Sequence, residues 1–301
     1  MKNWLFGCVC ASLLVAAGPG CAALNVFATV PEWGALADEI GGDKVKVYVA
    51  TSAAQDPHHV EAKPSLIARA RNADLVVATG ADLEVGWLPL VLQQAGNPKL
   101  RPGQPGYFEA AAFVNLLDKP ARLDRAEGDV HAAGDPHIQT DPRNIARVAA
   151  ALAARLAEVD PSNAETYRTR HKAFDEKWRA AIARWERDAA PLKGAPIVVQ
   201  HKAFTYLIRW LGLDTVATLE PKPGVEPTTA SLTEVLALLQ RKPAKMVLRA
   251  AYQGDRASQW IAERAKLTPV VLPFTVGGDP EAKDLYALFD DTIARLLKGA
   301  Q

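Results

Sequence analysis

The stretch Asp160–Arg187, DPSNAETYRTRHKAFDEKWRAAIARWER, decides how this chain is organised. Asp-Pro opens a helical pattern, and the run is charged on most faces, with Trp178 and Trp185 seven residues apart on one stripe. About 27 helical residues would extend ~40 Å at 1.5 Å per residue, which is enough to run the length of a two-lobed protein. We therefore predict a continuous, rigid helix that connects two lobes.

On both sides of this helix, apolar strand patterns alternate with helical patterns. The predicted strands are 25–30, 45–50, 74–79, 196–200, 214–218, 245–248 and 269–276. The predicted helices are 64–72, 142–159, 233–240 and 285–298. This alternation is typical of βαβ units. We predict an α/β fold of two lobes, 24–159 and 191–301, each a mainly parallel sheet flanked by helices and joined by helix 160–190.

The first residues have the layout of a secretory signal. Lys2 precedes an uncharged apolar run from Trp4 to Ala17, and small residues follow up to Ala23. We predict a signal peptide over residues 1–23 and a periplasmic protein; the alternative is a lipoprotein acylated at Cys21. Either cut removes the other two cysteines and leaves no disulfide.

Composition and motifs exclude several classes of function. The chain has 35 basic and 34 acidic residues, and loss of Lys2 with the signal leaves 34 of each, so the formal charge becomes zero. No polybasic tract interleaved with aromatic residues is present, so we expect no nucleic-acid partner. Neither a His-Glu-x-x-His helix nor a Gly-x-Ser-x-Gly elbow occurs, so we expect no enzyme activity.

Three of the six histidines lie where the chain should turn at the edge of a sheet. His58 follows strand 45–50, His201 ends strand 196–200, and His137 lies in a loop before helix 142–159. Ligands of open α/β sheets gather outside the carboxyl ends of strands, and imidazoles suit zinc. The segment that begins at His171, His-Lys-Ala-Phe, repeats the four residues that begin at His201. It lies inside the long helix, so we expect His171 to take no part in binding a ligand. As a candidate ligand, His131 in the loop 128–134 ranks between these three histidines and His171.

Five motifs in order carry a family resemblance. They are Asp56-Pro-His58, Ala73-Asp-Leu-Val-Val-Ala-Thr-Gly80, Asp135-Pro-His137, His201-Lys-Ala-Phe-Thr-Tyr206 and Glu220-Pro-Lys-Pro-Gly-Val-Glu-Pro227. Together they resemble the cluster A-I solute-binding proteins that serve zinc and manganese ABC importers. We consider two roles for the last motif. It forms a loop between the lobes, and its carboxylates cap a helix or orient a ligand histidine.

The resemblance implies a ligand set. His58, His137 and His201 match the family's three nitrogen ligands, and a histidine at the third position favours zinc, because members proposed to carry manganese commonly have glutamate there. It implies a carboxylate as fourth ligand, best matched by Asp279. Asp284, Glu281 and water stay open as alternatives, and His59 is the rival of His58.

The resemblance also implies a function: capture of Zn²⁺ outside the cytoplasmic membrane and its delivery to an ABC transporter permease. A periplasmic metallochaperone is a further candidate partner, and we expect a monomer. The alternatives are a manganese-binding protein of the same type, a secreted zinc hydrolase, a binder of an organic metal chelate and a surface adhesin.

We predict that the exported chain begins at or near Leu24 and contains no thiol, because small residues occupy the positions before the expected cut. Intact-mass analysis of the exported protein measures this directly. A mass that corresponds to a lipid-modified Cys21 would instead identify a membrane-anchored protein.

Overall fold

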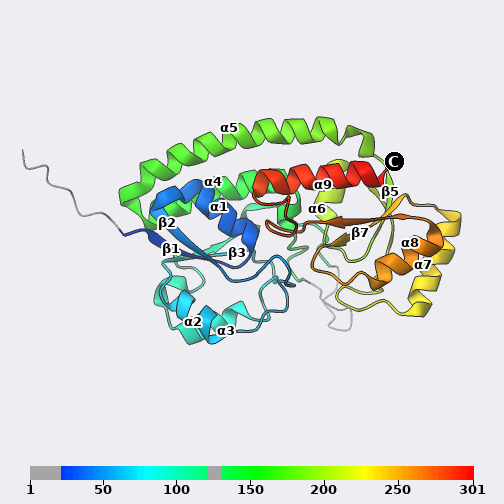
Figure 1. Ribbon diagram of the computed structural model, residues 1–301. Coiled ribbons are helices and arrows are strands. Elements are labelled where there is room, and N and C mark those ends of the chain that lie inside the picture. The colour runs from blue at the N-terminus through cyan, green and yellow to red at the C-terminus, as the bar shows by residue number, and fades with distance from the viewer. Residues whose placement is uncertain (1–21, 121–130) are drawn as a thin grey trace, which may run out of the picture.

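Two four-stranded parallel sheets form the centre of the structure, a computed structural model that describes residues 22–120 and 131–301 (Figure 1). The first sheet has the order β2-β1-β3-β4, with β1 Leu24–Ala28, β2 Val45–Val49, β3 Leu75–Ala78 and β4 Tyr107–Glu109. The second has the order β6-β5-β7-β8, with β5 Pro196–Val199, β6 Asp214–Thr218, β7 Met246–Ala250 and β8 Thr268–Leu272. The predicted α/β fold class is confirmed.

The predicted strands all form, with two differences. β4 has only three residues and was not predicted from the sequence. The last strand was predicted to run to residue 276 but ends at Leu272. Pro273 follows directly, and a proline cannot donate an amide hydrogen bond to a neighbouring strand. The residues that follow, Phe274 and Thr275, are buried in a loop instead.

Helices cover both sheets. They are α1 Pro31–Gly41, α2 Pro64–Arg71, α3 Leu88–Ala95, α4 Pro142–Val159, α5 Ala164–Asp188, α6 Thr205–Leu211, α7 Thr229–Arg241, α8 Arg256–Ala265 and α9 Leu285–Gly299. Proline, whose fixed φ suits a first helical turn, begins α1, α2 and α4. The Asp141 side chain caps α4 by accepting a hydrogen bond from the Arg143 amide.

The long helix α5 lies along one side of the molecule beside both lobes (Figure 1). Its 25 residues correspond to about 38 Å. The predicted tryptophan stripe is real: the five buried side chains are Tyr167, Phe174, Trp178, Ala181 and Trp185. Trp178 Nε1 donates to the Pro142 carbonyl at 2.8 Å, and Trp185 Nε1 donates to Asp290 Oδ1 of α9 at 2.6 Å. The helix is thus fastened to α4 and to the last helix of the chain.

The two lobes share a hydrophobic core. The main cluster of buried side chains contains Val26 of β1, Val199 of β5 and Trp178 of α5. α9 follows the second sheet but also contacts α1 of the first lobe. Because the packing is continuous, the lobes cannot swing apart without exposing this core. The domain boundaries at residues 159 and 190 stay a prediction.

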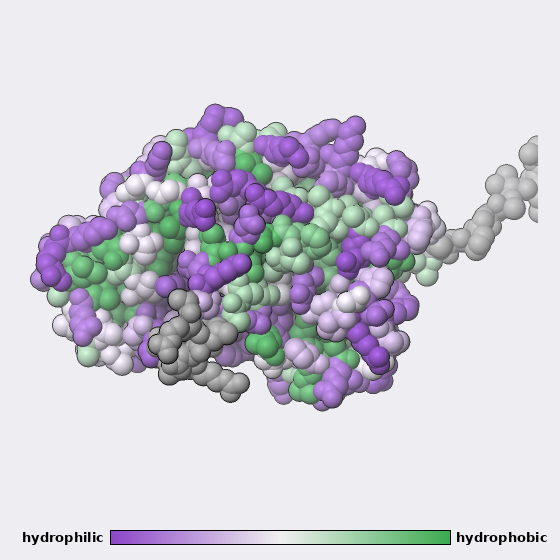
Figure 2. Space-filling view, turned by 180° about the vertical axis from the view of Figure 1, so that it is seen from behind, coloured by the Kyte–Doolittle hydropathy of each residue, from purple (hydrophilic) through white to green (hydrophobic). Residues whose placement is uncertain are grey.

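The outer surface mixes polar and apolar side chains. Figure 2 shows hydrophilic and hydrophobic residues intermingled over one face. Among the described residues, the large apolar side chains that are exposed lie at scattered sequence positions: Val85, Leu90, Phe113 and Val225. The monomeric state stays a prediction.

The predictions for the N-terminus lie largely outside the described residues, because the structure describes the chain from Ala22 onward and leaves out Cys8, Cys10 and Cys21. Within 22–120 and 131–301, no helix is both long and apolar enough to cross a membrane. The signal peptide and the rival lipid anchor stay predictions.

Trp178 should be a main source of stability, because its side chain is fully buried between Phe174, Trp185, Tyr286 and Phe289. We expect Trp178→Ala to lower the free energy of unfolding by about 3–5 kcal/mol, measured by urea denaturation. Lys177→Ala, at the exposed neighbouring position, is the matched control and should change it by less than about 0.5 kcal/mol. Equal losses from the two variants would contradict the packing role of Trp178.

Candidate metal centre

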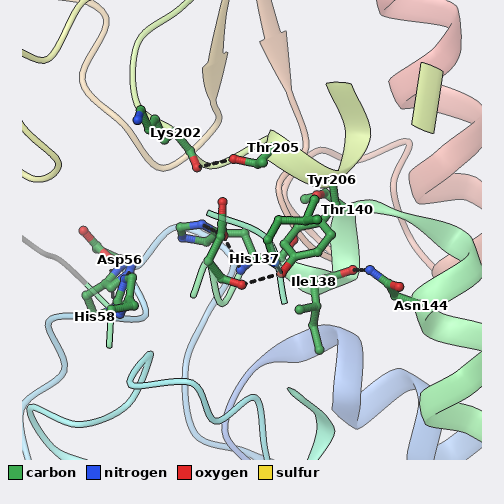
Figure 3. Close-up of polar contacts among 12 residues, drawn as sticks. Asp56, His58, His137, Ile138, Thr140, Asn144, Lys202, Thr205 and Tyr206 are labelled. Atoms are coloured by element: carbon green, nitrogen blue, oxygen red, sulfur yellow. Dashed lines mark hydrogen bonds and ion pairs between the residues drawn. The ribbon is translucent and has the colours of Figure 1, made fainter. Parts of the chain in front are cut away.

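Loops at the carboxyl ends of the two sheets bring histidines together between the lobes. His58 lies in the loop after β2, and His201 follows β5 by two residues. His137 precedes the short 3-10 turn η5, Ile138–Thr140, which leads into α4. Figure 3 shows His58 beside Asp56, and His137 at the start of the turn that Thr140 and Asn144 hold.

The three predicted histidines lie close together. The ring centroids of His58 and His137 are 5.3 Å apart, those of His137 and His201 5.7 Å, and those of His58 and His201 6.3 Å. In a tetrahedral zinc site, Zn–N bonds of about 2.0–2.1 Å separate ring centroids by about 5.2 Å. As the side chains lie, no three histidine, cysteine, aspartate or glutamate groups of the described residues already stand in ligating geometry. The rings would need to move inward by about 1 Å or less to surround a zinc ion.

A carboxylate holds each ring from behind. Nδ1 of His58 lies 2.8 Å from Asp56 Oδ1, and Nδ1 of His137 lies 2.8 Å from Asp135 Oδ1. Nδ1 of His201 lies 2.6 Å from Glu220 Oε2. A proton on each Nδ1, donated to the carboxylate, leaves the Nε2 lone pair free for a metal. The prediction that the Glu220–Pro227 segment orients a histidine is confirmed for Glu220.

The repeated Asp-Pro-His motif has a structural explanation. In both copies the aspartate Oδ1 also accepts a hydrogen bond from the histidine amide, at 2.9 Å in His58 and 2.8 Å in His137. The same oxygen therefore fixes both the backbone turn and the ring of the histidine two residues later. In the first copy, the Pro57 carbonyl accepts a further hydrogen bond from Trp87 Nε1 at 3.0 Å. The motif thus fixes the position and orientation of one imidazole ring.

The electrostatics keep the carboxylates ionised. Burial opposes ionisation of Asp56 and Asp135, but hydrogen bonds and charge interactions with His58 and His137 outweigh it and hold the pKa of each carboxyl at about 2. Burial lowers the pKa of His137. Burial also opposes protonation of His201, but Glu220 outweighs it and raises that pKa.

His137 Nε2 is buried and has no hydrogen-bond partner in the described part of the chain. Leaving a buried nitrogen unsatisfied costs free energy, about 1–3 kcal/mol. A metal ion bound by this lone pair would remove that cost. His137 is only 3% exposed, so the unsatisfied nitrogen does not face bulk solvent.

The predicted carboxylate ligand, Asp279, is paired with an arginine in the structure. Asp279 Oδ2 pairs with Arg295 Nη2 of α9 at 2.7 Å, and its Oδ1 accepts a hydrogen bond from the Glu281 amide at 3.1 Å. Asp284 caps α9 by accepting from the Ala287 amide at 2.8 Å. Glu281 is exposed. Asp279 makes no hydrogen bond to a histidine among the described residues, so its role as fourth ligand stays a prediction.

A fourth histidine, His131, lies close to His58 and His137. The sequence indicated this residue only weakly. The ring of His131 stacks on that of His58 at 5.2 Å and lies 6.3 Å from that of His137. Burial lowers the pKa of His131 to about 4, and repulsion from His58 and His137 adds to this effect. His59 is exposed, with its ring 6.3 Å from that of His58. A weak signal for His131 was its place four residues before Asp135-Pro-His137.

Two contacts tie the lobes together around the site. Tyr206 Oη of α6 donates to the Asp135 carbonyl at 2.6 Å, next to His137, and accepts from the Leu117 amide at 3.1 Å. The Thr275 hydroxyl, in the loop after β8, donates to the buried carboxyl of Glu32 on α1. Burial raises the pKa of Glu32 to about 7, although the bond from Thr275 opposes this shift. These hydrogen bonds therefore fix the positions of the two lobes relative to each other around the histidines.

Comparisons with known proteins identify the family of the chain. The family model of the periplasmic zinc-uptake complex component A, ZnuA, matches residues 26–299. The zinc-binding lipoprotein AdcA of Streptococcus pneumoniae serotype 4 is 25% identical over 265 residues, which are 86% of this chain and 51% of AdcA. The chain therefore spans about half the length of AdcA.

Another relative covers more of its own length. The manganese ABC transporter substrate-binding lipoprotein PsaA of S. pneumoniae is 22% identical over 294 residues, which are 94% of this chain and 90% of PsaA. A crystal structure of ZnuA has the same fold, with a TM-score of 0.77 at 22% identity over 93% of this chain and all of that one. The chain belongs to the ZnuA family, within the cluster A-I metal-binding solute-binding proteins.

Proposed function

We propose that this protein captures Zn²⁺ outside the cytoplasmic membrane and delivers it to the permease of an ABC importer, with His58, His137 and His201 as metal ligands. The observation that carries the proposal is the meeting of three imidazoles, each with Nδ1 on a carboxylate. Such outer carboxylates fix the ring orientation and raise the basicity of the ligating nitrogen. In this role the metal is cargo.

Nitrogen ligands favour zinc over manganese as that cargo. Imidazole suits zinc, whereas carboxylate and water oxygens suit manganese. The three carboxylates nearest the rings are engaged with Nδ1 atoms, and Asp279 is engaged with Arg295. A manganese carrier is the second candidate, because a relative of nearly full coverage is named as a manganese protein.

A secreted zinc hydrolase fits less well. Such an enzyme needs an open coordination position and a carboxylate base beside it. Glu61, the acid that follows His58 in sequence, is exposed and lies 4.0 Å from Lys63 Nζ. We therefore propose a carrier and not an enzyme. A permease and, as a further candidate, a periplasmic metallochaperone would be its partners.

Loss of one of the three proposed ligand histidines should abolish tight zinc binding. We expect the purified protein to bind one zinc per chain from an equimolar zinc and manganese mixture, measured by elemental analysis. His201→Ala should weaken zinc binding by more than about 100-fold in competitive titration with a chelator, because a ligand loss costs more than the 10–100-fold of an outer-shell change. We expect it to be the most damaging of the single histidine changes.

His171→Ala is the matched control, because it removes a histidine from the same four-residue motif in α5. It should leave the zinc affinity within about twofold of wild type, as for a substitution away from the site. Comparable losses from His171→Ala and His201→Ala, or preferential loading of manganese, would overturn the proposal.

The carboxylate behind His201 should also matter. Glu220→Ala removes the acceptor 2.6 Å from Nδ1, and we expect zinc affinity to fall about 10–100-fold. Glu220→Gln keeps an acceptor without the charge and should lie between Ala and wild type. Glu226→Ala removes an exposed carboxylate of the same segment and serves as the control. If Glu226→Ala weakened binding as much as Glu220→Ala, Glu220 would have no specific role.

A further inference from the structure

The ring of His131 approaches that of His58, one of the proposed ligands. Its Nε2 lies 3.3 Å from the Nε2 of His58. Two nitrogens bound to one tetrahedral zinc are about 3.3 Å apart, because each lies about 2.0–2.1 Å from the metal. The separation also suits a hydrogen bond between two neutral rings. In the hydrogen-bonded pair His131 Nε2 carries the proton, because His58 has its proton on Nδ1. A metal ion bound by both nitrogens would require the His131 proton to be on Nδ1, which leaves both Nε2 lone pairs free.

The backbone around His131 is fixed by several hydrogen bonds. The amide of Ala132 donates to Asp82 Oδ2 at 3.0 Å, in the loop after β3. The carbonyl of His131 accepts from the Gly134 amide at 3.2 Å, and the Asp135 amide donates to the Leu117 carbonyl at 2.8 Å. His131 is therefore held in the cluster by contacts on both the first lobe and its own turn.

Two of the three carboxylate candidates for the same position, Asp279 and Asp284, are engaged with other groups. Asp279 would have to leave the Arg295 guanidinium, 2.7 Å away, before it could bind a metal. Asp284 would have to give up the N-cap of α9. His131 needs no such exchange, because its nearest polar partner is the ring of another proposed ligand.

We propose that His131 is the fourth ligand and that the ion is held by four imidazoles. This inference rests on the proposed metal-binding function and specifies its coordination shell. Four nitrogen ligands close the tetrahedral zinc shell without an open position for water. They also offer no oxygen to manganese, which strengthens the preference for zinc.

X-ray absorption spectroscopy of the zinc-loaded, full-length protein tests the shell without any substitution. We expect a zinc site with four nitrogen neighbours and the multiple-scattering pattern of four imidazoles. A shell of three imidazoles and one oxygen would overturn the proposal and leave the three-histidine function intact.

Competitive zinc titrations of three variants provide the second readout. We expect His131→Ala, as the loss of a ligand, to weaken binding by more than about 100-fold, which exceeds the effect of an outer-shell change, and to reduce the imidazole count by one. His59→Ala is the matched control, because it removes an exposed histidine whose ring lies 6.3 Å from that of His58. It should change affinity by less than about twofold.

Asp279→Ala is the variant that tests the rival ligand. A loss of affinity in Asp279→Ala with none in His131→Ala would overturn the proposal in favour of a carboxylate. If His201→Ala also bound zinc as wild type does, the proposed function itself would fail. Should His131→Ala fold poorly by circular dichroism, His131→Gln and the wild-type spectrum decide the question.

Discussion

The pairing of an imidazole with a carboxylate is the interaction on which the site depends. It occurs three times, at Asp56–His58, Asp135–His137 and Glu220–His201. Each pair favours the proton on Nδ1 and leaves the lone pair of Nε2 free for a metal. Two of the pairs are built by one local motif, in which the aspartate also fixes the backbone of its histidine. The third joins two strand ends, because His201 follows β5 and Glu220 follows β6.

The fold supplies the convergence that these pairs need. All strands within each sheet are parallel, so the strand ends of each lobe lie at one edge. The continuous core and α5 hold these two edges opposite each other. Wide hinge bending would break the contacts of Trp178 and Trp185, so release of the ion must come from smaller rearrangements of the loops. The Thr275–Glu32 and Tyr206–Asp135 hydrogen bonds join elements of the two lobes near these loops.

The sequence predicted the fold well, because strand and helix patterns are local. Helix 142–159 forms with the predicted bounds, and α5 differs at its ends by a few residues. The three histidines were found because strand ends and a repeated triplet mark them. The sequence did not predict that His131 lies at the site. Its loop has neither a strand end nor the repeated triplet, and its contact with His58 joins residues 73 positions apart in the sequence. The ion pair of Asp279 with Arg295 is equally non-local, because it depends on how α9 packs after β8 ends early.

Charge gives a physical reason for this site to bind a cation. Asp56 and Asp135 stay ionised far below neutral pH, and with Glu220 they place up to three negative charges behind rings that are neutral when they ligate. The side chains of Asp135 and Glu220 are only 7% and 13% exposed, and buried charges of one sign are unfavourable unless compensated. A divalent ion bound by the Nε2 atoms compensates two of these charges without displacing any Nδ1 bond. The carboxylates therefore contribute attraction for the ion, whereas the imidazoles determine which ion fits.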